Sequence, residues 1–204
     1  MELLVDTDAF CKLAVAGLLE DAIRLLGAAL SDCRRLPALP HMLRRGRLRK
    51  KYGAEVCDRL VPLAESIPAI AQSTGAWLAR LTAIEAIDPG EAQILAVAAE
   101  GGAVVLTDDK RALRAVKDVA GLPGALVGRI VVLENVLLAL CDHIGANEVR
   151  QRIQPLRSHD VVVSVCFSDA VSNPRDGLQS YFQSIAAEVA PLVLWVPPPS
   201  RGKT

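Results

Sequence analysis

The stretch LTAIEAIDPGEAQILAVAAEGGAVVLTDDKRALR, residues 81–114, is the part of the sequence that decides the fold. Its segment DPGE, residues 88–91, has the chemistry of a helix start, because proline and acidic residues suit the exposed N–H groups and the positive dipole end of a new helix. The helix that follows, residues 92–99, is apolar on nearly every face and is therefore predicted to be buried. The pair Gly101-Gly102 ends this helix, and residues 103–106 show the pattern of a buried strand. The stretch thus predicts a helix and a strand from the interior of an α/β protein.

Acidic residues follow two of the predicted strands. Thr107-Asp108-Asp109 comes directly after the strand of residues 103–106, and Asp6 follows the short apolar strand of residues 3–5. In open α/β sheets, ligands bind outside the carboxyl ends of the strands. Asp6 alone would be explained equally well as the N-cap of the helix that follows it. The second acidic strand end favours a binding site at this edge of the sheet.

Short apolar strands alternate with longer helices along most of the chain. This alternation predicts the α/β class, with a parallel central sheet flanked by helices on both faces. Strands are predicted at residues 3–5, 103–106 and 129–133, helices at 9–30, 55–65, 71–83, 92–99, 111–116, 134–143 and 146–156, a polar turn at 31–35 and a loop at 121–128.

The last part of the chain has a pattern of its own. The β-branched run of residues 161–167 predicts a strand, residues 177–189 a helix, and residues 192–196 a second strand that is stopped by three prolines. We therefore divide the chain into a main domain, residues 1–157, and a C-terminal strand–helix–strand extension, residues 158–204. The pattern leaves open whether this extension continues the main sheet or forms a small subdomain. Its last residues, 200–204, are predicted to be a disordered tail.

The composition excludes some classes of protein. The chain has 23 basic and 23 acidic residues among 204, so no global field draws it to nucleic acid or to a membrane. Hydrophobic residues make up 51%, which favours a homo-oligomer or a partner protein that covers some of the apolar surface. The first apolar helix is interrupted by charged residues, so it is not predicted to span a membrane.

The cysteines and the N-terminus predict a cytoplasmic protein. The five cysteines are odd in number and widely spaced and show no metal-binding pattern, so we expect buried, reduced thiols. The N-terminus carries Glu2, Asp6 and Asp8 and no basic lead, which is not the pattern of a signal peptide.

A basic run at residues 44–51 is the best candidate for contact with phosphate. It places six positive charges in eight residues of a chain without net charge, and such a local concentration suits a polyanion. A solvated helix face would show the same pattern, so both interpretations stand. The predicted substrate-binding residues of this run are Arg44, Arg45, Arg47, Arg49, Lys50 and Lys51.

Three carboxylate positions are predicted to converge on one edge of the sheet: Asp6, Glu91, and Asp109 with Asp108 beside it. Carboxylates within a few ångströms of each other repel unless a cation lies among them. Such a cluster is expected to bind a hard divalent ion, and Mg²⁺ or Mn²⁺ keeps positions open for water and a phosphate. An ion of this kind activates water for in-line attack on phosphorus and stabilises the leaving oxygen. The cluster therefore predicts metal-dependent chemistry on a phosphodiester.

Two motifs resemble those of the PIN-domain nucleases. LLVDTDAF, residues 3–10, is similar to the first strand and first acid of that family. GEAQILAVAAEGGAVVLTDDKRALR, residues 90–114, is similar to its closing half, in which an acid is followed by a buried helix, a strand and Thr-x-Asp. The separation of the acids in this half also matches the family. The resemblance extends over residues 1–157 and does not cover the rest of the chain.

The resemblance implies a parallel sheet flanked by helices and an activity that cleaves phosphodiesters, usually those of RNA. It makes Asp6, Glu91 and Asp109 the metal ligands and catalytic acids, with Asp108 assisting directly or through water. Thr107 then orients the strand-end turn beside the substrate. The implied cofactor is Mg²⁺ or Mn²⁺ and the implied substrate is RNA. An antitoxin is the partner expected if the chain is the toxin of a toxin–antitoxin pair.

One acid of the family pattern is missing. PIN nucleases carry a Glu in an early helix, and the comparable residues 39–43 contain none. Glu55 is a candidate substitute from the next helix, and His41 is interpreted as a structural residue before a metal or phosphate contact. Asp88 does not match a family acid and is interpreted as a residue that stabilises a helix start.

Three hypotheses follow from these residues. The first is a PIN-type endoribonuclease, as in toxin–antitoxin pairs. The second is a catalytically reduced PIN-like module that binds protein or RNA. The third, a phosphate- or nucleotide-binding regulator of doubly wound fold, is disfavoured because the chain lacks a glycine-rich phosphate loop.

Overall fold

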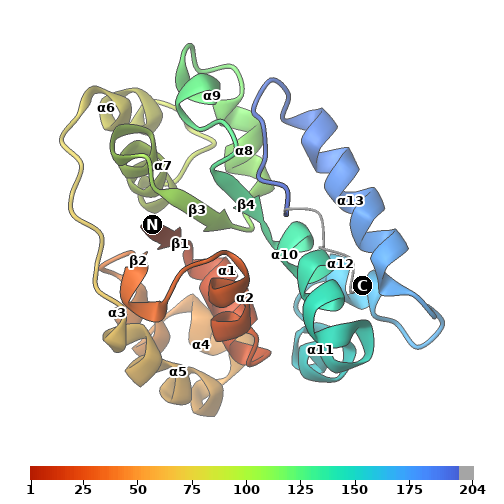
Figure 1. The fold of residues 1–204 in the computed structure, drawn as a ribbon. Coiled ribbons are helices and arrows are strands. Elements are labelled where there is room, and N and C mark those ends of the chain that lie inside the picture. Colours follow the sequence, from red (N-terminus) through yellow and green to blue (C-terminus); the bar gives the residue numbers. More distant parts are fainter. Residues whose placement is uncertain (198–204) are drawn as a thin grey trace.

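In the computed structural model, which describes residues 1–197, four short strands form a parallel central sheet (Figure 1). The strands are β1 (Leu3–Val5), β2 (Cys33–Arg35), β3 (Val104–Thr107) and β4 (Ile130–Val132), and their order across the sheet is β2-β1-β3-β4. Leu4 of the central strand β1 lies opposite Arg34 of β2 and opposite Val105 of β3. The predicted α/β class with a parallel sheet is confirmed. The tail predicted at residues 200–204 lies outside the described residues.

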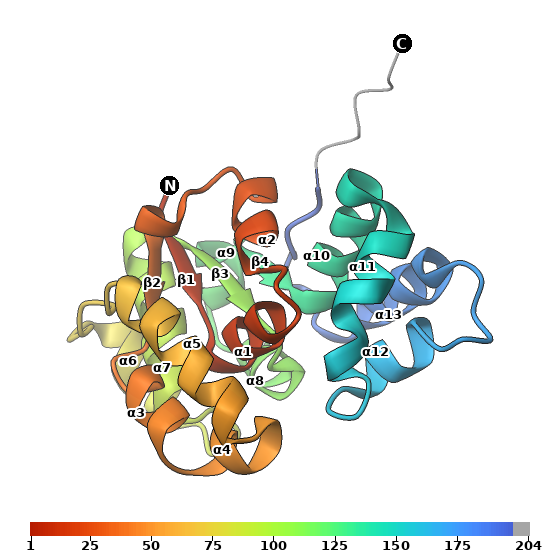
Figure 2. The same ribbon diagram turned by 90° about the horizontal axis from the view of Figure 1, so that it is seen from below.

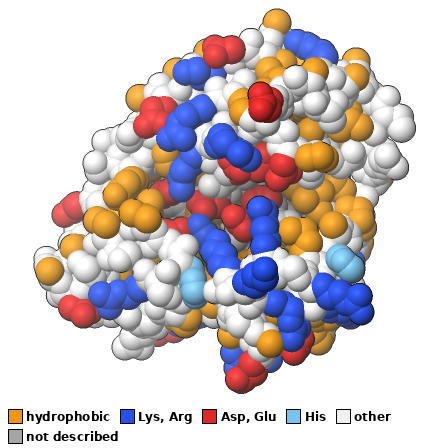
Figure 3. Space-filling view, turned by 180° about the vertical axis from the view of Figure 1, so that it is seen from behind, with side chains coloured by type: hydrophobic (Ala, Val, Ile, Leu, Met, Phe, Trp, Pro, Cys, Tyr) orange, Lys and Arg blue, Asp and Glu red, His pale blue; other side chains and the backbone are white. Residues whose placement is uncertain are grey.

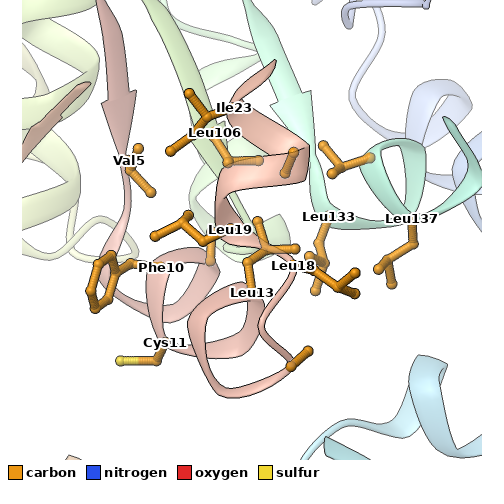
Figure 4. Close-up of a cluster of buried hydrophobic side chains, with 14 of the residues drawn as sticks. Val5, Phe10, Cys11, Leu13, Leu18, Leu19, Ile23, Leu106, Leu133 and Leu137 are labelled. Carbon is orange, nitrogen blue, oxygen red and sulfur yellow. The ribbon is translucent and has the colours of Figure 1, made fainter. Parts of the chain in front are cut away.

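Alternate side chains of the strands enter two separate cores, one on each side of the sheet. Leu3, Val5 and Leu106 belong to the first core, and Leu4 and Val105 belong to the second. This is the period of two that a strand imposes when both of its faces are buried. Figure 4 shows part of the first core, where Val5 and Leu106 of the sheet lie near Phe10, Leu19 and Ile23.

Helices cover both faces of the sheet, as predicted, and each core includes side chains from several of them. Figure 2 shows α10 to α13 gathered at one side of the molecule, beyond β4. The first core takes side chains from α1 (Thr7–Val15), α2 (Leu19–Leu25), α3 (Leu39–Arg44), α4 (Arg47–Tyr52), α5 (Ala54–Ser66), α10 (Leu133–Leu140), α11 (Ala146–Ile153) and α12 (Val161–Cys166). The second core takes them mainly from α6 (Ala76–Thr82), α7 (Pro89–Gly101), α8 (Lys110–Val116), α9 (Leu122–Ala125) and α13 (Pro174–Glu188). Short turns of other helix types are η1 (Leu30–Asp32), η2 (Cys141–Gly145) and η3 (Gln154–Leu156).

Two predictions for the first 35 residues were wrong. The helix predicted at residues 9–30 is divided into α1 and α2, because Gly17 takes a φ of 63° that side chains other than glycine rarely adopt. The polar turn predicted at residues 31–35 contains η1 and strand β2 instead. The strand accommodates Arg35 because its guanidinium donates to the carbonyl oxygens of Ala64, at 2.6 Å, and of Leu36, at 3.0 Å.

The strand predicted at residues 161–167 was also wrong, because the segment forms helix α12. Asp160 caps this helix and accepts a hydrogen bond from the amide of Val163 at 2.8 Å. Val163 and Cys166 are buried, whereas Val161 is 75% and Val165 50% exposed, which is the spacing of a helix with one buried face. A strand would also need a free sheet edge, and isolated bridges with Ala69 and Leu194 already lie at the two edges. Tertiary packing therefore overrides the preference of valine for strands.

Of the other two elements predicted for the C-terminal extension, the helix is confirmed and the strand is not. The helix predicted at residues 177–189 is confirmed as α13. The strand predicted at residues 192–196 is reduced to one parallel bridge beside β4, in which the amide of Trp195 donates to the carbonyl of Ile130 at 2.8 Å. This bridge continues the main sheet, so the predicted strand–helix–strand unit is a mostly helical segment attached to the β4 edge.

Residues on both sides of the predicted boundary at residue 157 share the two cores. Phe167 lies in the first core with Phe10, and Val189 lies in the second core with Val132. The five cysteines are free and buried, as predicted. None of the helices in residues 1–197 is long and apolar enough to cross a membrane.

Candidate metal and phosphate site

A cleft of about 390 Å³ opens at the carboxyl ends of β1 and β3, and three of the predicted acids line it. Asp6 directly follows β1, Asp109 follows β3, and Glu91 lies in the first turn of α7. Figure 3 shows a hollowed face of the molecule on which acidic side chains gather at the centre, with lysine and arginine side chains around them. The other charged residues of the lining are Asp8, Arg47, Asp88 and Arg111.

Asp6 is both the N-cap of α1 and an acid of the cleft. Its carboxylate accepts hydrogen bonds from the amides of Thr7, at 2.6 Å, and Asp8, at 3.3 Å, and the residue is only 8% exposed. Burial, together with the nearby charges of Asp8 and Asp108, raises the pKa of Asp6 to about 7. Capping thus accounts for the position of this carboxylate but leaves its charge poorly compensated, which favours a cation beside it.

Glu91 is held at the cleft by the start of α7. Asp88 caps this helix, as predicted: its carboxylate accepts from the amide of Glu91 at 2.9 Å, and the Glu91 carboxylate accepts from the amide of Asp88 at 2.9 Å. This reciprocal capping box fixes one oxygen of Glu91. Pro89, at the first position of the helix, has no N–H that would need a partner.

Asp109 is held by the turn that leads from β3 into α8. One of its carboxylate oxygens accepts from the amide of Ala112 at 2.8 Å, and its own amide donates to the Thr107 hydroxyl at 3.0 Å. Glu91 lines the same cleft as Asp109. Burial and a hydrogen bond to the Asp109 carboxyl group raise the pKa of Glu91 to about 8. Burial also acts to raise the pKa of Asp109, but the hydrogen bonds from Glu91 and from the Ala112 amide outweigh it and lower that pKa.

Asp108 is next to Asp109 in sequence but is neutralised by two lysines. It pairs with Lys12 and with Lys110, whose Nζ lies 3.0 Å from Asp108 Oδ1. Lys12 also pairs with Asp160, and Lys110 Nζ lies 2.5 Å from Glu134 Oε1. The acids near the strand ends therefore fall into two sets: one that is paired with buried lysines and one that faces the cleft.

The predicted basic run contributes one residue to the cleft lining, Arg47. Arg44 pairs with Glu65 at 2.5 Å, and Arg49 pairs with Asp58. Lys51 lies over the ring of Tyr52, 5.1 Å from its centre. The run thus divides into residues with a local partner, the cleft residue Arg47, and the exposed side chains Arg45 and Lys50.

Helices α3, α4 and α5 supply no acid to the cleft lining among the described residues. From this part of the chain the cleft is lined by Leu36, Ala38, Met42 and Arg47, while His41 is exposed. Glu55 points to solvent, with 89% of its side chain exposed and Arg59 at 3.8 Å. A further acid comes from α1: Asp8, two residues after Asp6, lines the cleft.

Sequence reasoning missed both Asp8 and the buried partners of Asp108. The alternation Asp6-Thr7-Asp8 at a strand end was the available signal for Asp8. A lysine on an otherwise apolar helix face was the signal for Lys12, which is 5% exposed among the core residues of α1. An acid two residues after the buried strand β4 was the signal for Glu134.

The chemistry of the cleft fits a hard divalent cation, although the side chains are not grouped as a finished metal site. Within residues 1–197, no three His, Cys, Asp or Glu side chains are placed so that they could hold a metal ion as they stand. Asp6, Glu91 and Asp109 offer only oxygen donors, which suit Mg²⁺ or Mn²⁺. Among the described residues, these three acids form one ion pair, and it is long: Arg111 Nη2 lies 3.9 Å from Asp109 Oδ2. A cation bound there would displace the proton that the raised pKa of Glu91 favours.

Comparisons with family models, with curated proteins and with solved structures found no match for this chain.

Proposed function

We propose that the chain is a metal-dependent ribonuclease of PIN type that cleaves phosphodiester bonds in the cleft of Asp6, Glu91 and Asp109. The observation that carries the proposal is the division of the acids into two sets. Asp108 and Asp160 are ion-paired with Lys12, whereas the three cleft acids come from separate segments and meet without a lysine partner in the described residues. Uncompensated carboxylates at the carboxyl ends of parallel strands are where a cation and a phosphate are expected.

The residues of the cleft have separate roles in this proposal. Asp6, Glu91 and Asp109 hold Mg²⁺ or Mn²⁺, which when bound supplies an activated water and stabilises the leaving oxygen. Thr107 accepts from the amide of Asp109 and so fixes the turn that presents this acid. Arg47 and Arg111, both exposed at the cleft, donate to phosphate oxygens of the bound strand.

The test is cleavage of end-labelled single-stranded RNA by the purified chain in Mn²⁺ or Mg²⁺. The wild-type protein is expected to cut, and chelation of the metal is expected to stop it. Asp6→Asn removes a charge but keeps a capping oxygen, and it should lower the rate at least about a hundredfold, the scale on which one transition-state contact acts. Asp118→Asn, at an exposed position on the surface, is the matched control and should cut like wild type. Equal cutting by Asp6→Asn and wild type would assign the activity to a contaminant.

A binding module without catalysis is the second candidate function. The observation that favours it is the cleft lining at Ala38 and Met42, where the family resemblance would place an acid. Calorimetric titration with Mn²⁺ separates the two functions. A chain that binds no Mn²⁺ at millimolar concentration but still binds RNA is a binding module, and a chain that binds both is the nuclease that we propose.

A further inference from the structure

A chain of five buried charges runs beside the candidate site, and the proposed reaction does not use it. In order, it consists of Asp160, Lys12, Asp108, Lys110 and Glu134, with alternating sign. Four of these side chains are at most 8% exposed, and that of Lys110 is 22% exposed. Neither oxygen of Glu134 accepts a regular hydrogen bond within residues 1–197, although Lys110 lies in ion-pair contact with it. Charges so far from water persist only where each has a partner, so this network holds the segments that carry its members together.

Lys12 lies where three segments meet. It belongs to α1, whose N-cap is the cleft acid Asp6. Its ammonium group reaches Asp108, in the turn that follows β3, and Asp160, the N-cap of α12. Burial acts to lower the pKa of Lys12, but the charges of Asp108 and Asp160 outweigh it and raise that pKa, so the ammonium group stays charged. One buried cation therefore ties α1, the β3–α8 turn and α12 to each other.

The two neighbouring acids of the β3–α8 turn, Asp108 and Asp109, have different partners. Asp108 is bound by Lys12 and Lys110, while Asp109 lines the cleft and accepts from the amide of Ala112. Because the two residues are consecutive, an anchor on the first restricts the backbone that orients the second. A backbone rotation that freed Asp108 from Lys12 would therefore also move Asp109.

We propose that Lys12 is a positioning residue of the cleft: by anchoring Asp108 it fixes the direction of Asp109, and through Asp160 it makes α12 part of the support of the site. The effect on catalysis rests on the proposed function. The effect on the turn does not, because it can be measured in the protein without metal or RNA.

The experiment measures amide hydrogen exchange of the full chain in three variants. The amide of Ala112 donates to Asp109 Oδ1 and reports the turn, while the amide of Val105 donates to the carbonyl of Arg129 in the sheet and reports global opening. Lys12→Met removes the charge and keeps most of the side-chain length. Lys12→Arg keeps a cation that can bridge two carboxylates. Lys117→Met is the matched control, because Lys117, the C-cap of α8, donates to the carbonyl of Glu188 and forms no ion pair with the acids of the network within residues 1–197.

Lys12→Met is expected to speed exchange at Ala112 about tenfold more than at Val105, since local opening precedes global opening. Lys12→Arg and Lys117→Met should leave the ratio of the two rates within about twofold of wild type. If the Lys12→Met protein does not fold, Asp160→Asn takes its place, because asparagine still caps α12 but holds Lys12 less firmly; the ratio should then rise about threefold. Equal acceleration at Ala112 and Val105 in the variant that folds would show a purely structural lysine and overturn the proposal.

A second measurement relates the anchor to the reaction. In single-stranded RNA cleavage, Lys12→Met or its substitute should lower kcat about tenfold while KM changes less than about twofold, and Lys12→Arg should restore kcat. If the wild-type chain cuts no RNA, the proposed function fails while the exchange ratio still decides the positioning role. If kcat falls without a change in the exchange ratio, the positioning role fails while the nuclease stands.

Discussion

Glu91 and Asp109 line the same cleft, although Glu91 lies in the first turn of helix α7 and Asp109 follows strand β3. Burial and a hydrogen bond to Asp109 raise the pKa of Glu91, so the two carboxyl groups hold one proton between them at neutral pH. The pair therefore occupies the place where the proposed reaction needs a cation, and proton and metal ion compete for the same oxygens.

This competition predicts that Mn²⁺ affinity depends on pH. The pKa of Glu91 is raised to about 8, so the shared proton is present at neutral pH and must leave when the ion binds. The affinity should fall by up to about tenfold between pH 8 and pH 7, where one proton is displaced from Glu91, and more steeply below pH 7, where Asp6 is protonated as well. Calorimetric titrations at pH 6, 7 and 8, each in two buffers of different ionisation enthalpy, measure both the affinity and the proton released.

Glu91→Gln supplies the control for this prediction. It removes one titrating group and should weaken Mn²⁺ binding while abolishing the pH dependence between pH 7 and pH 8; the dependence that Asp6 contributes below pH 7 should remain. Glu85→Gln, at an exposed position before the same helix, should behave like wild type. An affinity that stays constant from pH 6 to pH 8 in the wild-type chain would contradict the shared proton.

Asp6→Asn should stabilise the metal-free protein at alkaline pH. The pKa of Asp6 is raised from 3.8 to about 7 in the folded chain, so the folded state holds a proton that the unfolded state releases between these values. Well below pH 3.8 both states are protonated and nothing is lost; as the pH rises from 3.8 through 7, the unfolded state ionises while the folded state keeps its proton, so stability falls, and above pH 7 the loss is complete. Asparagine cannot ionise, so it should raise the free energy of unfolding by about 4 kcal/mol at pH 8.

Urea unfolding in the presence of a chelator, at pH 5 and pH 8, measures this effect. The gain from Asp6→Asn should be larger at pH 8 than at pH 5, and Asp118→Asn should show no such difference. A variant that is less stable than wild type at pH 8 would mean that the charged carboxylate is worth more as a cap of α1 than it costs by burial.

Arg47 and Arg111 are predicted to contact the phosphates of RNA. Both line the cleft, whereas Arg49, from the same basic run as Arg47, is paired with Asp58. For binding to a single strand, the logarithm of the binding constant falls linearly with the logarithm of the salt concentration. Removing one phosphate contact makes this slope shallower by about 0.7. Arg47→Ala and Arg111→Ala should each do so, and Arg49→Ala should not.

Fluorescence anisotropy with labelled RNA at several salt concentrations measures this slope. The Asp6→Asn background prevents cleavage during the titration. Arg59→Ala, at an exposed position of α5, serves as the control for an unspecific loss of charge. Equal slopes for all four arginine variants would assign the affinity to the general charge of the surface.

The sequence could predict those residues of the site whose positions depend on local structure, such as strand ends and helix starts. Asp6 and Asp109 follow strands, and Glu91 lies in a helix start marked by Asp88 and Pro89. Because the carboxyl ends of parallel strands share one edge, these three acids had to come near each other once the sheet was parallel.

The rest depends on contacts between distant parts of the chain. Lys12 and Asp160 are 148 residues apart, and no local pattern says that Asp108 turns toward them while Asp109 turns toward the cleft. The valines of α12 have the composition of a strand, and the arginines of β2 have that of a turn. In both segments, packing against neighbouring elements of the fold determines the secondary structure and overrides local propensity.

Phe167→Ala should destabilise the entire chain and not only its C-terminal segment. Phe167 is fully buried and lies in the first core with Phe10, on the other side of the boundary predicted at residue 157. Truncation of a buried phenylalanine costs about 3–5 kcal/mol, and because both parts share one core, the loss should appear in a single cooperative transition. Val165→Ala, at a position 50% exposed on the same helix, is the control and should cost less than about 0.5 kcal/mol. Scanning calorimetry together with circular dichroism checks the number of transitions. The Phe167→Ala chain could instead melt in two steps and still bind Mn²⁺ after the first. Residues 158–197 would then be an independent domain, and α12 would not support the cleft.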